Sequence, residues 1–302
     1  MKKFLLYAGI FWIAFFALII SLRCLWIRYA PSFLERGFIG KDIHYVVAGP
    51  SNAQFAWNDR IIPHSKNLCF TALSMGACYN TVKWAVEYNG TKIDTVCLGA
   101  SFIGILFNDD SRIDPRFEEE KRLLDYDDFF HQFRHDSRYL KMAISSFSNT
   151  LVGKRRMGGG YQDLTRNKLH HPKAFDRVKK VKEMAGEGGW TEAKIREKCQ
   201  YQIRHLRRIK EYCDNHNITL VILSTPVYKI DEILSDDGYR SLLKNELGDS
   251  TLIADYSNFK LPDDSYYADV EHVNQKGAEY FSKYIAEHGL TLQYAIDYCN
   301  AK

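Results

Sequence analysis

The chain has 302 residues, of which 46% are hydrophobic and 26% are charged, and its formal net charge is +4. Its 41 basic residues nearly balance its 37 acidic residues, which argues against nucleic acid as a partner. This is the composition of a globular protein with enough chain for one large core or two small ones.

The chain begins with a run that contains no charged residue, from Phe4 to Leu22. Lysines precede it and Arg23 follows it, and about 20 apolar residues are enough for a helix that spans a bilayer. The run lacks the shorter apolar core and the small-residue cleavage site of a signal peptide. We therefore expect an uncleaved membrane anchor over residues 1–28. Because a short N-terminal tail usually stays in the cytoplasm, the expected location is the inner (cytoplasmic) membrane, single-pass, with the main domain periplasmic or extracellular.

Five short apolar runs rich in β-branched residues follow the anchor. Continuous apolar runs are typical of strands that are buried on both faces of a parallel sheet. Helical patterns lie between them, which predicts a three-layer α/β domain with a five-stranded parallel sheet over residues 41–302. The predicted strands are Ile43 to Gly49, Asn67 to Leu73, Asp94 to Ser101, Ile218 to Pro226 and Ser250 to Ser257.

The third and fourth predicted strands lie too far apart for a single crossover. The sequence between them is basic, rich in glycine and poorly periodic, so we expect an insertion at about 102–190. A helical stripe follows it, with Ile195, Ile203 and Leu206 at steps of three and four. Near the end of the chain, Asn274 and Gly289 are placed to begin and end a last helix.

The sequence contains no pattern that predicts a metal site or a cofactor. None of the seven cysteines forms a C-x-x-C pair, and we expect them to be reduced packing residues. His170 and His171 have no carboxylate or cysteine at helical spacing beside them. The acidic run Asp109-Asp110 lacks the glycine and the glutamate of a calcium loop, and no phosphate loop or dinucleotide fingerprint is present.

Ser51 is the first residue with candidate chemistry, because it follows the first predicted strand directly after Gly49-Pro50. Ligands of open α/β sheets bind at the carboxyl ends of the strands. Two interpretations stay open from this stretch alone. Serine is a favoured N-cap of helices. It is also a nucleophile when a histidine accepts its proton and helix N–H groups stabilise the resulting oxyanion.

The partners that a nucleophile needs occur before the predicted last helix. Asp269 and His272 are three positions apart in the stretch DVEHVNQKG. This spacing on a tight turn lets the carboxylate reach one imidazole nitrogen and leaves the other free for a serine. On their own, the two residues are equally compatible with an exposed loop.

The serine after the first strand, together with Asp-x-x-His before the last helix, resembles the SGNH (GDSL-like) hydrolase superfamily. The resemblance covers roughly residues 41–289, without the insertion. It implies a flavodoxin-like sheet, with Ser51 as nucleophile, His272 as general base and Asp269 as the residue that orients the histidine.

The other blocks of that superfamily are altered here. Pro50 stands where the family has aspartate, and Ser101 stands near the position of the family's oxyanion-binding asparagine, since Asn108-Asp109 come too late. Besides the N–H of Ser51, the family's oxyanion site uses a glycine N–H after the second strand. The sequence leaves three candidates for that donor open: Thr71, Ala72 and Gly76.

Two functions remain in competition. The first is a membrane-anchored serine esterase or O-acyltransferase that acts on an acylated cell-envelope glycan, with residues 4–22 in the membrane and a multispanning acyl-transfer protein as a possible partner. The second is an inactive SGNH-like binding or assembly protein of envelope polysaccharide biosynthesis. A cytosolic nucleotide-binding protein fits less well, because the phosphate loop is missing. Aromatic residues that could stack on sugar rings are Trp57, Trp190, Tyr266 and Tyr267.

Overall fold

The protein is described here by a computed structural model. It describes residues 2–34, 39, 42–71, 73–88, 93–107, 160–165, 167–169, 171, 175–229 and 236–300.

One six-stranded sheet organises the domain, in the order β2-β1-β3-β4-β5-β6. The first five strands are parallel, and their order is the doubly wound order 2-1-3-4-5, which reverses direction between β1 and β3. The strands are β1 (Tyr45–Ala48), β2 (Ser65–Asn67), β3 (Thr95–Leu98), β4 (Thr219–Ser224), β5 (Leu252–Asp255) and β6 (Gln293–Tyr294).

Two strand predictions are corrected. The sheet is mixed and has six strands, because β6 pairs antiparallel with β5 through two residues, too few to leave an apolar pattern in the sequence. The second strand was expected at Asn67 to Leu73, but β2 ends at Asn67. Leu68 and Leu73 are buried in the connection that follows, so this segment has apolar residues without being a strand.

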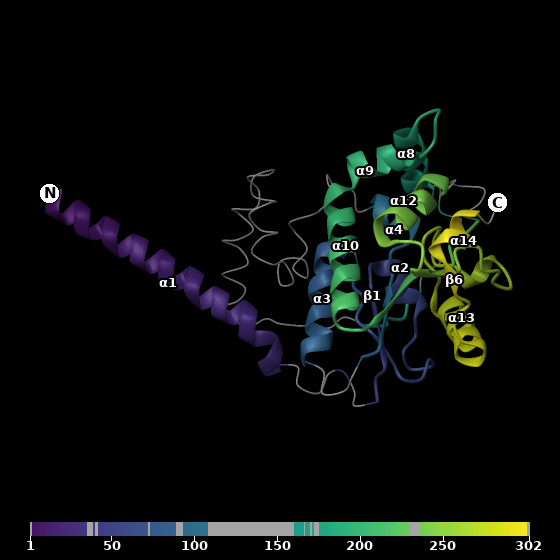
Figure 1. Ribbon diagram of the computed structural model, residues 1–302, viewed down its shortest axis with the longest axis horizontal. Helices are drawn as coiled ribbons and strands as arrows, with labels where there is room; N and C mark the ends of the chain where they lie inside the picture. Colours follow the sequence, from purple (N-terminus) through teal and green to yellow (C-terminus); the bar gives the residue numbers. More distant parts are fainter. Residues whose placement is uncertain are drawn as a thin grey trace.

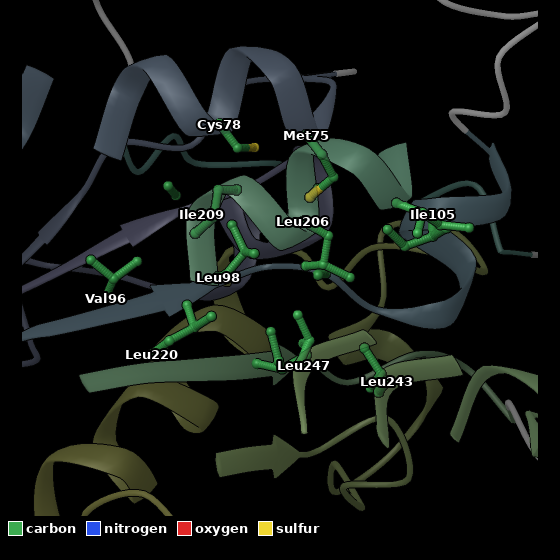
Figure 2. Packing of buried hydrophobic residues seen from close by; sticks show 14 of the residues in the cluster. Met75, Cys78, Val96, Leu98, Ile105, Leu206, Ile209, Leu220, Leu243 and Leu247 are labelled. Atoms are coloured by element: carbon green, nitrogen blue, oxygen red, sulfur yellow. The ribbon is translucent and has the colours of Figure 1, made fainter. Parts of the chain in front are cut away.

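Helices cover both faces of the sheet. Figure 1 shows α3 and α10 on one side and α13 on the other. Val46 and Val47, neighbours in β1, belong to two different apolar clusters, because successive strand residues point to opposite faces. Figure 2 shows the larger cluster, in which Leu206 and Ile209 of α10 lie over Leu98 of β3. The described helices of the domain are α2 (Ser51–Ala56), α3 (Met75–Tyr88), α4 (Phe102–Phe107), α8 (Asp176–Ala185), α9 (Glu192–Lys198), α10 (Gln200–Asn215), α12 (Asp237–Leu247), α13 (Gln275–His288) and α14 (Ala295–Asn300), with the 3₁₀ turn η2 (Asp264–Tyr266).

The N-terminal run forms one helix, α1 (Lys2–Leu34), which extends away from the sheet in Figure 1. The uninterrupted part of α1 whose side chains are described covers residues 6–22. Within the described part of the chain, no helix is long and apolar enough to cross a membrane, so the expected span is not found there.

The expected insertion at about 102–190 lies mostly outside the described residues. Its first residues form α4, and its described end contains α8. The six described cysteines form no disulfide with one another, and five of them are buried. Of the aromatic residues considered for sugar stacking, Trp57, Trp190 and Tyr267 are core residues, as most aromatic residues are.

Candidate active site

The turn between β1 and α2 places Ser51 at the carboxyl edge of the sheet. Pro50 is the N-cap of α2, with φ of −76° and ψ of −170°, and its carbonyl accepts a hydrogen bond from the Gln54 N–H at 3.1 Å. Ser51 is therefore the first helical residue. No side chain caps the helix, so the cap interpretation of Ser51 is wrong and its hydroxyl is available for another partner.

Two glycines let this turn approach the neighbouring strand. Gly49 follows β1 and Gly99 follows β3, and a Cβ on Gly49 would lie 2.8 Å from the Gly99 Cα. A Cβ on Gly99 would lie 2.7 Å from the Cβ of Ala53 in α2. Because real Cβ contacts are longer, the close seating of α2 on the sheet requires both glycines. This contact lies between β1 and β3, where the direction of the strand order reverses.

The histidine is held by a short hairpin before α13. Tyr267 and Val273 form an antiparallel bridge, and the His272 carbonyl accepts the N–H of Ala268 at 2.8 Å. Asn274 is the N-cap of α13, as expected, because its side chain accepts the Gly277 N–H at 3.2 Å. His272 therefore lies between a closed hairpin and a capped helix, which fixes its backbone.

Asp269 organises the inside of this hairpin. Its Oδ1 accepts the backbone N–H groups of Glu271 and His272, each at 3.0 Å. The same oxygen lies 2.7 Å from Nδ1 of the His272 ring. A carboxylate oxygen only accepts, so Nδ1 carries a proton in this contact and Nε2 of neutral histidine has a free lone pair. The spacing of three thus brings carboxylate and imidazole together as expected.

The hydroxyl of Ser51 lies 2.8 Å from Nε2 of His272, across 221 positions of sequence. The His272 residue is 7% exposed, whereas Ser51 is partly exposed. The distance falls within the range of about 2.6–3.2 Å for a nucleophile and its base. The three residues therefore form one continuous hydrogen-bonded chain whose serine end is open to solvent.

Two residues of α2 that the sequence did not single out also contact this histidine segment. The buried side chain of Asn52 donates from Nδ2 to the carbonyl of Glu271 at 2.9 Å. The ring of Phe55 meets the His272 ring edge to face, with centroids 5.4 Å apart. Phe55 lies four positions after Ser51, on the same side of the helix, so this spacing was the available signal for it. No sequence pattern pointed to Asn52.

The residues expected to bind an oxyanion do not gather around Ser51 in the described contacts. Ser101 follows β3 and is buried, but its Oγ accepts the Gly104 N–H at 3.1 Å and thereby caps α4. Gly76 faces Tyr201 of α10, because a Cβ there would overlap the Tyr201 hydroxyl, and the described contacts do not bring it to Ser51. Thr71 donates to the side chain of Gln54 in α2 at 3.0 Å. The third open candidate, Ala72, lies outside the described residues.

The described residues contain no cluster of histidine, cysteine and carboxylate side chains that could hold a metal ion. His171 is exposed, while His170 and the acidic residues at 109–110 lie outside the description. Burial raises the pKa of the Cys97 thiol to about 12 and that of the nearby Cys69 thiol well above its usual range. Thiolates are the reactive form of cysteine, so these two buried thiols are not candidate nucleophiles at neutral pH.

Comparisons of the chain with models of known protein families, with curated proteins and with solved structures gave no match.

Proposed function

We propose that this protein is a serine-dependent esterase or O-acyltransferase in which Ser51 is the nucleophile, His272 the general base and Asp269 the residue that orients the base. The observation that carries the proposal is the pair of contacts on the His272 ring, 2.8 Å to Ser51 Oγ and 2.7 Å to Asp269 Oδ1. A histidine that is bonded in this way accepts the serine proton while the carboxylate stabilises the imidazolium that forms.

The reaction follows from these contacts. Ser51 Oγ attacks the acyl carbonyl carbon as its proton passes to Nε2 of His272. The tetrahedral intermediate collapses, the C–O bond to the alcohol breaks, and His272 returns the proton to the departing alcohol oxygen. Water or a second hydroxyl group then attacks the acyl-serine, again with His272 as base, and Ser51 is released. The N–H groups at the start of α2, which have no acceptor within the helix, support the oxyanion in this proposal.

The substrate class and the location are parts of the same proposal. The resemblance to SGNH hydrolases suggests an acylated glycan of the cell envelope, and a multispanning acyl-transfer protein would supply the acyl group if the reaction is a transfer. Apolar side chains are exposed along α1, among them Phe4 and Ile13, which are each 73% exposed. A large exposed apolar surface favours contact with a membrane or a protein. We therefore propose that α1 attaches the domain to the cytoplasmic membrane, on its outer side.

A fluorophosphonate probe tests the chemistry without knowledge of the substrate. We expect labelling of the full chain that is lost in Ser51→Ala, with hydrolysis of p-nitrophenyl acetate falling about 10⁴-fold or more in Ser51→Ala and His272→Ala. Asp269→Asn should also lower the rate, because an amide can stabilise the wrong tautomer. Ser257→Ala, at the carboxyl end of β5, is the matched serine control and should label normally.

A non-catalytic binding or assembly protein is the second candidate. It is favoured by Ser101, which stands near the position of the family's oxyanion-binding asparagine but whose hydroxyl caps α4. Loss of one oxyanion donor typically costs about 3–4 kcal/mol of transition-state stabilisation. Folded wild-type protein that resists the probe, together with an unchanged cellular phenotype of Ser51→Ala, would favour this candidate over the enzyme.

A further inference from the structure

Asn52 links the segment of the nucleophile to the segment of the base. It follows Ser51 directly, and its Nδ2 donates to the carbonyl of Glu271, the residue directly before His272, at 2.9 Å. The bond spans 219 positions of sequence, and the Asn52 residue is only 6% exposed. A buried amide that bonds to a buried carbonyl holds two backbones in fixed register, because either group left alone would lose its solvation without compensation.

The link differs from the other described contacts between these two segments. The contact between Ser51 and His272 changes when the serine proton is transferred, and the ring contact of Phe55 is also made with the reacting imidazole. The amide of Asn52 bonds to backbone and takes no part in proton transfer. It can therefore maintain the alignment of nucleophile and base while their own hydrogen bond breaks and forms again.

The far end of α2 is fastened separately. Ser282 of α13 donates from its Oγ to the Ala56 carbonyl at 3.2 Å and accepts the Asn58 N–H at 3.0 Å. This hydroxyl is also fully buried and also joins α2 to the segment that follows the histidine. These bonds are made by Ala56, the last residue of α2, and by Asn58 just beyond it, so they fix the far end of the helix without setting the distance from Ser51 to His272.

We propose that Asn52 is a positioning residue that sets the approach of Ser51 Oγ to His272 Nε2, an inference that rests on the proposed function. Its loss should reduce the rate of the chemical step and leave the binding of a small ester nearly unchanged. A misplacement of about 1 Å can lower a rate about 10²-fold.

The test compares Asn52→Leu, which keeps the branching and the number of side-chain heavy atoms but cannot donate a hydrogen bond, with Ser282→Ala as the matched control. For each full-length variant, one measures the melting temperature, the rate constant of Ser51 phosphonylation, and kcat and KM for p-nitrophenyl acetate. We expect Asn52→Leu to lower kcat and phosphonylation about 10- to 100-fold with KM nearly unchanged. Ser282→Ala should lose thermal stability and keep a rate within about threefold of wild type. If Asn52→Leu does not fold, Asn52→Ala provides the same comparison.

The outcomes separate this inference from the proposed function. If wild type reacts and Asn52→Leu reacts equally fast, or if both variants lose rate in proportion to stability, the positioning role is overturned and the proposed function stands. If wild type does not react, the proposed function fails. Crystal structures of wild type and Asn52→Leu then test the positioning role directly, through the distance between Ser51 and His272. A Ser51–His272 distance that lengthens in the variant supports the positioning role, and an unchanged distance refutes it.

Discussion

Replacement of Gly99 by alanine should separate Ser51 from His272 by moving α2. The added methyl would lie 2.7 Å from the Ala53 Cβ and 3.3 Å from the Gly49 Cα. Carbon atoms in contact prefer separations of about 3.5–4.0 Å, so α2 must move outward by about 1 Å. Ala53 is two residues after Ser51 in the same short helix. The 2.8 Å contact between Ser51 and His272 should therefore lengthen beyond hydrogen-bonding distance.

The expected result is a loss of both rate and stability. Phosphonylation of Ser51 and hydrolysis of p-nitrophenyl acetate should fall about 10²-fold, as for a misplacement of about 1 Å. The free energy of unfolding should fall by about 1–3 kcal/mol, which is typical of overpacking. Chemical denaturation followed by circular dichroism measures the free energy of unfolding, and the fluorophosphonate probe measures the rate of phosphonylation.

A second substitution distinguishes displacement of the helix from general damage. Ala53→Gly removes the methyl that the new side chain meets, at a cost of about 1 kcal/mol for glycine within a helix. In the double variant with Gly99→Ala, the rate should recover to within about tenfold of Ala53→Gly alone. A folded double variant that stays as slow as Gly99→Ala would refute the reasoning, as would a Gly99→Ala variant with the wild-type rate.

Glu246 and the buried thiols provide tests that do not depend on activity. Burial raises the pKa of the Glu246 carboxyl, but hydrogen bonds from Arg207 and Arg196 outweigh this effect and the net pKa is lowered. The stabilisation of the fold by the ionised carboxylate is therefore fully present above the unfolded pKa of about 4.3, and it is lost as the pH falls through the lowered folded pKa. Glu246→Gln should cost about 1–2 kcal/mol at about pH 7, and a difference in melting temperature that does not shrink toward about pH 3 would contradict this. Because the pKa of buried Cys97 is raised to about 12, iodoacetamide should modify the partly buried Cys299 well before Cys97 at about pH 8, and mass spectrometry of native protein would expose the reverse order.

The strands that could be predicted are those in which burial on both faces dictates the composition. The centres of β1, β3, β4 and β5 lie within the predicted apolar runs, because a strand covered by helices on both sides has no polar face. The strands at the two edges of the sheet, β2 and β6, were not predicted correctly. The apolar residues after β2 fill the core from a loop, and β6 has only two residues, so neither edge leaves a periodic pattern.

The candidate site was predictable to the extent that it depends on local geometry. The position of Ser51 follows from the rule for carboxyl ends of strands, and the contact of Asp269 with His272 follows from a spacing that closes a tight turn. The contact of Asn52 with Glu271 was not predictable. It joins a helix to a loop through a backbone carbonyl, and any residue type could have supplied that carbonyl.

The fold explains why proline suits position 50, where the SGNH pattern that the sequence resembles has aspartate. An N-cap needs an extended backbone, and the fixed φ of proline supplies it, here at −76°. The missing N–H of Pro50 removes one donor near Ser51. However, proline also has no side-chain oxygen, so no capping side chain accepts the N–H groups at the start of α2. An aspartate or serine at this position would compete for those N–H groups. Proline therefore orients the turn that presents Ser51, and it leaves the first N–H groups of α2 available to the oxyanion of the proposed reaction.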